Sequence, residues 1–212
     1  GLAINDIKGI IIANVVPETS FNLINLCEKY FEIRPMVVGE TEVDLGITID
    51  IDDPKEVGAD RVVNAVAALD RYKGSLIVVD FGTATTFDVV DADGTYRGGV
   101  IAPGINLSLE ALYNAAARLP RISISETKTN ESSIKTSNVI GKSTKAAMHS
   151  GIFWGYIGLI EGIVTRIKHE FAKPMTVIGT GGLASIFYNA TDSIDHIDAV
   201  SYTHLTLPTI LP

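Results

Sequence analysis

Apolar runs that suit buried strands alternate along this chain with segments whose apolar residues recur at helical spacing. Residues 8–17 are predicted to form a buried strand, residues 19–31 a helix, and residues 35–38 a second strand. Thr19 or Ser20 is expected to cap the helix. A strand, a helix and a further strand in this order are typical of an α/β fold, in which ligands bind beyond the carboxyl ends of the strands.

The strongest strand signals flank a short polar turn near the middle of the chain. Residues 76–79 are a continuous apolar run, and residues 85–90 are rich in β-branched and aromatic side chains. Between them, Gly82 would let an anion approach backbone N–H groups, and the Thr83 hydroxyl suits phosphate oxygens. Asp80 could hold a cation at the same place. The alternative is a plain hairpin in which Asp80 accepts hydrogen bonds from the turn.

The polar segment before an apolar helix predicted over residues 62–69 also carries candidate chemistry. Gly58 interrupts this segment, so Asp60 and Arg61 should lie near a helix N-terminus, where the helix dipole favours an aspartate and disfavours an arginine. Asp60 could accept a proton from a hydroxyl during phosphoryl transfer, or it could simply cap the helix. Arg61 suits a ligand carboxylate, the alternative being an ion pair with Glu56 or Asp60.

The rest of the chain continues the alternation of strands and helices. In order, the pattern predicts a strand at residues 95–101, a helix at 106–117, a surface loop at 123–137, a helix at 143–171, a strand at 175–178 and a helix at 183–188.

Four glycines share one face of the predicted helix at residues 143–171. They are Gly151, Gly155, Gly158 and Gly162, flanked by Trp154 and Tyr156. Glycine in a helix interior costs about 1 kcal/mol relative to alanine, so this stripe suggests close approach of another helix. That helix could belong to the same chain or to a second subunit. Because a symmetric contact uses one patch twice, a homodimer is the favoured interpretation.

Composition excludes several function classes. The 212 residues are 46% hydrophobic, and 17 Lys and Arg against 25 Asp and Glu give a net charge of -8. This charge argues against nucleic-acid or anionic-membrane partners, so any phosphate site must be local. The single cysteine, Cys27, fits a buried thiol in a reducing cytoplasm. No apolar run approaches the length of a membrane span and no leader is recognisable, so a cytoplasmic location is expected.

Taken together, several motifs closely resemble the type III pantothenate kinase family over residues 4–199. The matching motifs are GADR at 58–61, VVDFGTATTFD at 78–88, GGVIAPG at 98–104, ALYNAAARLP at 111–120, the helix segment at 141–163 that begins GKST, and IGTGGLA at 178–184. The resemblance implies an α/β fold of duplicated ribonuclease H-like (actin-like ATPase) domains with a nucleotide cleft between them. Residues 1–73 would be a partial N-terminal domain without its first strands, residues 74–199 the C-terminal domain, and residues 200–212 a non-native tail.

The same resemblance implies an activity and its cofactors. Members phosphorylate pantothenate to 4'-phosphopantothenate with ATP and Mg²⁺, in the first step of coenzyme A biosynthesis, and use a monovalent cation, K⁺ or NH₄⁺. They are homodimers, which agrees with the glycine stripe. The alternative for this chain is a non-enzymatic relative that binds a nucleotide or a protein partner.

Site roles are carried over from the family motif by motif. The resemblance implies that Asp60 is the general base, that Gly58, Ala59, Asp60, Arg61 and Thr144 bind pantothenate, that Asp80 binds the monovalent cation, and that Gly82, Thr83, Gly181 and Gly182 bind ATP.

The chain departs from the family pattern in three places. The family opens with an Asp-x-Gly-Asn-Thr-Asn motif that holds the phosphates of Mg-ATP, and this sequence lacks it, so we expect this chain alone to be inert although a chain with the motif would be a kinase. Ile51 replaces a tyrosine found in many members, and the loop at 123–137 is longer than usual. Residues 200–209 resemble one reading frame of a sequencing adapter, which suggests an artefactual tail.

Overall fold

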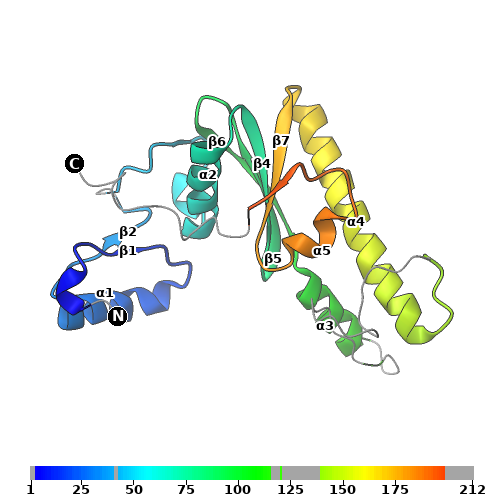
Figure 1. Cartoon of the computed structure of the whole chain (residues 1–212), viewed down its shortest axis with the longest axis horizontal. Helices are drawn as coiled ribbons and strands as arrows, with labels where there is room; N and C mark the ends of the chain where they lie inside the picture. The colour runs from blue at the N-terminus through cyan, green and yellow to red at the C-terminus, as the bar shows by residue number, and fades with distance from the viewer. Residues whose placement is uncertain (1–2, 41–42, 116–119, 121–138, 199–212) are drawn as a thin grey trace.

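The structure, a computed structural model, describes residues 3–40, 43–115, 120 and 139–198. Its strands form a small two-stranded sheet near the N-terminus and a six-stranded sheet that is the centre of the molecule (Figure 1). The expected loop at 123–137, the end of the expected helix at 106–117 and the expected tail at 200–212 lie outside the described residues. Among the helices that the structure describes, none combines the length and the hydropathy needed to cross a membrane.

The two-stranded sheet is built around helix α1. Strand β1 (Ile11–Ile12) pairs in parallel with β2 (Met36–Val37), and α1 (Pro17–Phe31) connects them. The prediction of a buried strand at 8–17 was wrong in extent, because β1 has two half-buried residues. The predicted cap at Thr19 or Ser20 was also wrong: Pro17 occupies the first helical turn, where its missing N–H is not needed, and Val16 is the N-cap.

The six-stranded sheet has the order β3-β6-β5-β4-β7-β8. Its strands are β3 (Thr48–Ile49), β4 (Ser75–Phe81), β5 (Ala84–Val90), β6 (Thr95–Pro103), β7 (Met175–Thr180) and β8 (His196–Ile197). β4, β5 and β6 form an antiparallel meander, whereas β7 pairs with β4 in parallel. The predicted hairpin around residues 82–84 is confirmed, and so is each strand predicted after it.

Helices cover both faces of this sheet (Figure 1). Helix α2 (Ala59–Arg71) packs on one face through Ala65 and Ala68, against a cluster that includes Leu76 and Val78 of β4. Helices α3 (Ile105–Ala115), α4 (Thr144–Phe171) and α5 (Ala184–Tyr188) pack on the other face, against a cluster that includes Ile77, Val79 and Phe87. Because successive strand residues point to opposite faces, the even-numbered side chains of β4 face α2.

Helix α4 begins where the sequence predicts but does not bury its glycine stripe. The Ser143 hydroxyl caps it by accepting a hydrogen bond from the Ala146 N–H at 3.2 Å. Gly151, Gly155 and Gly158 are exposed, and a Cβ at any of them would meet no atom within 4 Å. A partner helix from the same chain is therefore excluded among the described residues. Tyr156, which flanks the stripe in the sequence, is buried in the core and does not extend the exposed face.

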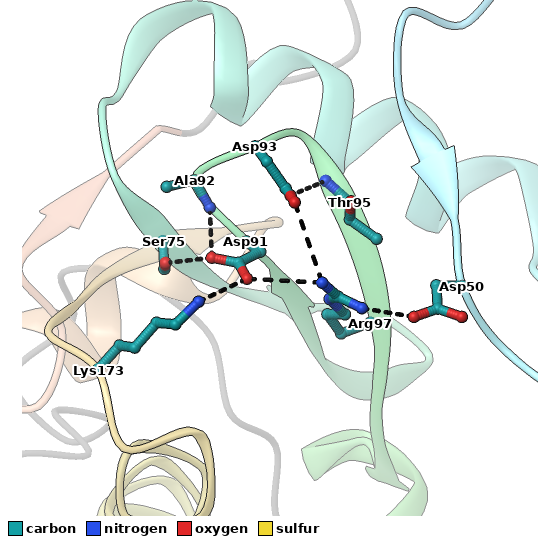
Figure 2. Close-up of polar contacts among 8 residues, drawn as sticks. All are labelled: Asp50, Ser75, Asp91, Ala92, Asp93, Thr95, Arg97 and Lys173. Atoms are coloured by element: carbon teal, nitrogen blue, oxygen red, sulfur yellow. Dashed lines mark hydrogen bonds and ion pairs between the residues drawn. The ribbon is translucent and has the colours of Figure 1, made fainter.

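The end of the sheet away from the β4–β5 turn is held by a charged cluster around Asp91 (Figure 2). The Asp91 carboxylate accepts hydrogen bonds from Ser75 Oγ at 2.9 Å, the Ala92 N–H at 2.7 Å and Lys173 Nζ at 2.8 Å. Arg97 lies on the other side, 3.7 Å from the same carboxylate. These donors, Lys173 first, lower the pKa of Asp91 to about 2. The cluster thus joins the start of β4, the end of β5 and the segment before β7.

Replacing Asp91 with asparagine should destabilise the protein most at neutral pH. The folded-state pKa of about 2 lies below the ordinary value of 3.8, so the ionised carboxylate stabilises the fold above pH 4 and loses that effect as the pH falls through 2. We expect Asp91→Asn to lower the urea midpoint of unfolding at pH 7, and the difference from the unaltered protein to narrow between pH 4 and pH 2.

The matched control is Asp192→Asn, since Asp192 is exposed and forms no ion pair within the described ranges. Its urea midpoint should follow that of the unaltered protein across the same pH range. A constant difference between Asp91→Asn and the unaltered protein at all pH values would contradict this account of the cluster.

Candidate active site

The carboxyl ends of β4 and β7 meet the start of α2 at the opposite end of the sheet from Asp91. Asn64 Nδ2, one turn into α2, donates a hydrogen bond to Asp80 Oδ2 of β4 at 2.9 Å. A Cβ at Gly181, directly after β7, would lie 2.5 Å from Asp80 Oδ1. The loop after β1 also reaches this place, since Val15 would lie 3.8 Å from a Cβ at Gly58. Segments far apart in the sequence therefore converge on Asp80.

Asp60 lies in the first turn of α2, and one of its carboxylate oxygens accepts a hydrogen bond from the backbone. Gly58 is the N-cap, so the alternative in which Asp60 itself caps the helix was wrong. Asp60 Oδ1 accepts a hydrogen bond from the Arg61 N–H at 2.8 Å, and a Cβ at Gly58 would lie 2.5 Å from that oxygen. The glycine leaves room for the carboxylate. Oδ2 has no hydrogen-bond partner among the described residues, so it can accept a proton from a ligand hydroxyl.

Arg61 reaches from α2 down to the sheet and pairs with Asp88 of β5. Its Nε and Nη2 each lie 2.7 Å from Asp88 Oδ1. The alternative of an ion pair with Glu56 or Asp60 was therefore wrong. Asp88 is 0% exposed, and its carboxylate also accepts hydrogen bonds from the Tyr96 hydroxyl at 2.7 Å and the Thr86 hydroxyl at 3.2 Å. A buried charge is tolerated where such donors surround it.

The protonation of this network follows from burial and charge. Burial raises the pKa of Asp88, while Arg61 and the Tyr96 hydroxyl act in the opposite direction. Burial, and then the neighbouring Asp88, raise the pKa of Tyr96. The Tyr96 hydroxyl therefore keeps its proton and remains a hydrogen-bond donor to Asp88.

The Asn64 side-chain amide donates a hydrogen bond through its nitrogen, whereas its oxygen has no partner among the described residues. Because carboxylate oxygens only accept, its amino group must face Asp80, and its Oδ1 is left buried without a partner in the part of the chain that the structure describes. Asn64 is 1% exposed. A buried amide oxygen beside a carboxylate is a donor set that suits a hard cation. The Asp80 carboxylate and the Asn64 amide oxygen therefore fit the cation-binding role expected for Asp80.

The β4–β5 turn is exposed at its tip and supported from beneath. Gly82 and Thr83 are exposed, and the Gly82 N–H donates to the Ala84 carbonyl at 3.1 Å. A Cβ at Gly104 would lie 2.1 Å from the Thr83 carbonyl oxygen, so the start of α3 packs directly on the turn. The predicted phosphate-binding turn thus exposes Gly82 and Thr83 to solvent, while the start of α3 packs beneath it.

Thr144 lies apart from this convergence, and Gly182 is exposed at its border. Thr144 is the exposed first residue of α4, which covers the face of the sheet opposite α2 (Figure 1). Gly182 is exposed beyond Gly181, and a Cβ there would meet no atom within 4 Å. Within this single chain, Thr144 is therefore not brought together with Asp60.

Asn64, Asp88 and Tyr96 belong to the site but were not singled out from the sequence. Asp88 lies in the quoted VVDFGTATTFD motif, eight positions after Asp80, and the even spacing across the hairpin places both on the α2 face. Asn64 follows Asp60 by one helical turn. These two spacings were the signals available. The described residues contain no group of three His, Cys, Asp or Glu side chains that could hold a metal ion.

The fold alone is shared with a solved structure. A Baf family protein from Campylobacter jejuni superimposes with a TM-score of 0.59 at 20% identity, covering 95% of this chain and 83% of that chain. This likeness shows the fold class, an α/β protein with a mixed sheet, and carries no information about the activity of this chain.

Closer relatives identify the family. The family model described as type III pantothenate kinase matches residues 2–166. The type III pantothenate kinase of Rhodospirillum rubrum is 61% identical over 198 residues, covering 93% of this chain and 74% of that protein. The Caulobacter vibrioides enzyme of the same name is 55% identical over 199 residues, covering 94% of this chain and 73% of that protein. This chain belongs to the type III pantothenate kinase family.

Alanine at position 181 should disturb the site through the backbone. Gly181 has a φ of 87°, and a Cβ there would also lie 2.7 Å from the Phe81 carbonyl oxygen as well as against Asp80. We expect Gly181→Ala to lower the free energy of unfolding by about 1–3 kcal/mol in urea denaturation.

Gly182→Ala is the neighbouring control, because its Cβ would enter open space. It should change the free energy of unfolding by less than about 0.5 kcal/mol. Equal stability of the two variants would show that the close packing of Gly181 against Asp80 is not a constraint on the fold.

Proposed function

We propose that the protein transfers the γ-phosphoryl group of ATP to the primary hydroxyl of pantothenate, yielding 4'-phosphopantothenate for coenzyme A biosynthesis. The supporting observation is the geometry of α2, which presents Asp60 with an unpartnered oxygen and, one turn later, ties Asn64 to Asp80. A general base and a cation ligand thus lie at the same end of one helix, as phosphoryl transfer to an alcohol requires.

Pantothenate binds at the start of α2 in this proposal. Asp60 Oδ2 takes the proton from the attacking hydroxyl, while its Oδ1 stays fixed by the Arg61 N–H. Gly58, Ala59 and Arg61 contact the substrate around this carboxylate, with Arg61 facing the pantothenate carboxylate. Because Thr144 is not near Asp60 within one chain, it would add its contact only from α4 of a second subunit. The half-buried position of Asp60 limits access of water to the base.

ATP binds beside the β4–β5 turn. Thr83 offers an exposed hydroxyl to its phosphates, Gly82 beside it leaves space for them, and Gly181 and Gly182 contact its adenosine. Asp80, with Asn64 beside it, would hold K⁺ or NH₄⁺. Mg²⁺ would bind together with the phosphates, since it keeps several waters and needs few protein ligands. It would neutralise the negative charge that develops during the transfer. A cytoplasmic location stays a prediction from composition.

We also propose that the six-stranded sheet is the C-terminal of two ribonuclease H-like domains. The meander β4–β5–β6 followed by two strands parallel to β4, with helices on both faces, supports this assignment. The division at residues 73 and 74 stays a prediction, although β3 and α2, which precede it, pack on the second sheet.

The base is tested by Asp60→Asn in this chain joined at its N-terminus to the family's Asp-x-Gly-Asn-Thr-Asn segment, a protein called full-length here. Asparagine keeps the shape and the acceptor for the Arg61 N–H but cannot accept the proton, so kcat for pantothenate should fall by about 10²- to 10⁴-fold while ATP binding by calorimetry is unchanged. Asp70→Asn, at the exposed far end of the same helix, is the control and should retain full turnover.

Other results would point elsewhere. Full turnover by Asp60→Asn would remove Asp60 as the base. Absence of pantothenate phosphorylation by the unaltered full-length protein, with ATP still bound, would favour the non-enzymatic nucleotide-binding alternative.

We further infer that two chains form a homodimer through the glycine stripe of α4. The support is its exposure: a Cβ at Gly151, Gly155 or Gly158 would meet nothing within 4 Å, although glycine is unfavourable in a helix. A stripe without side chains lets two helices approach closely, and a two-fold axis would pair the stripe with itself.

Glutamate at position 155 should separate the subunits without unfolding the chain. Its side chain has space in the monomer and it favours helix more than glycine does, but in a dimer it would bury an unpaired charge. In sedimentation equilibrium we expect the full-length protein as a dimer and Gly155→Glu as a monomer. Lys73→Glu, exposed between α2 and β4, should stay dimeric. An unaltered dimer in Gly155→Glu would refute this interface.

A further inference from the structure

The Arg61 guanidinium is held along one edge only. Its Nε and Nη2 both lie 2.7 Å from Asp88 Oδ1, while Nη1 has no hydrogen-bond partner within the described part of the chain. The side chain is 16% exposed. Because the guanidinium is planar and its donors are fixed in a fork, holding one edge determines where the remaining donors point.

The residue that holds this edge is itself immobilised by the sheet. Asp88 accepts from the hydroxyls of Tyr96 and Thr86, so each of its oxygens has a partner on a strand. The Tyr96 ring centroid lies 5.8 Å from Arg61 Cζ, which allows a cation–π contact. A Cβ at Gly99 would lie 2.0 Å from the Phe87 carbonyl oxygen and 2.9 Å from Arg61 Nη2, so close backbone packing requires glycine there and the guanidinium lies beside it.

We infer that Asp88 is a positioning residue that aims Arg61 at the pantothenate carboxylate and thereby sets the affinity for this substrate. This inference rests on the proposed function. Asp88 is buried and touches no substrate, so it acts through Arg61 alone. Tyr96 assists by donating to the same oxygen that Arg61 uses, which gives that oxygen a second fixed partner.

The arrangement also explains why an arginine can reside at the start of a helix. The dipole disfavours a cation there, and an unpaired Arg61 would have no preferred orientation. The buried carboxylate draws the guanidinium away from the helix axis and onto the sheet. The substrate carboxylate then meets a group whose orientation is already fixed, which reduces the entropy lost on binding.

The test measures KM for pantothenate in the full-length protein carrying Asp88→Asn. Asparagine has the size of aspartate but cannot accept two charge-assisted bonds from Arg61. We expect KM for pantothenate to rise about tenfold, with KM for ATP unchanged and kcat altered less than twofold.

A double-variant cycle separates positioning from general damage. If Asp88 acts through Arg61, then Asp88→Asn should add no further increase in KM once Arg61→Gln is present. Tyr96→Phe is a milder variant that removes one hydrogen bond to Asp88. It should raise KM about threefold, again only when Arg61 is intact, and it carries the test if Asp88→Asn does not fold by circular dichroism.

An unchanged KM for pantothenate in the folded single variants would overturn the inference. So would an increase in KM that multiplies with that of Arg61→Gln, because Asp88 would then act independently of Arg61. If the unaltered full-length protein fails to phosphorylate pantothenate, the proposed function is refuted and this inference with it, which is a different result from an active enzyme with unaffected variants.

Discussion

The buried carboxylate of Asp88 is the constraint on which the candidate site depends. A fully buried aspartate must be matched by donors, and Arg61 is the only cation that pairs with it within the described residues. That pairing places the first turn of α2 over β5. Asp60, the next residue back along the helix, is held separately, through the Arg61 backbone N–H. The orientation of the Arg61 side chain is thus a consequence of how the sheet neutralises a buried charge.

The β4–β5 hairpin carries a polar group at each end, and the two groups have different environments. At one end, Asp91 accepts hydrogen bonds from Lys173, Ser75 and a backbone N–H, which lower its pKa. This cluster stabilises that end of the sheet. At the other end, Asp80 has Asn64 beside it, and the Asn64 amide oxygen is left unsatisfied. A satisfied cluster suits stability, whereas an incompletely satisfied one suits a ligand.

The elements of this fold have stronger local signals in the sequence than the contacts between them. The hairpin, the strand at β7 and the long helix α4 have strong local signals, and each was predicted to within a few residues. The ion pair of Arg61 was not, because Asp88 is 27 positions away and its side of the sheet depends on strand register. The strand predicted before Pro17 was wrong in extent because a proline is compatible with both the end of a strand and the first turn of a helix, and only tertiary packing decides between them. The glycine stripe was recognised, but whether it faced a core or solvent could not be read from spacing.

The alternation of side chains along β4 and β5 has an evolutionary consequence. Asp80, Thr86 and Asp88 face α2 because each is separated by an even number of residues along the paired strands. Insertion or deletion of a single residue within either strand would turn these polar groups toward the apolar side that α4 covers, and would turn a phenylalanine or valine toward α2. The lengths of these two strands should therefore be invariant among functional descendants.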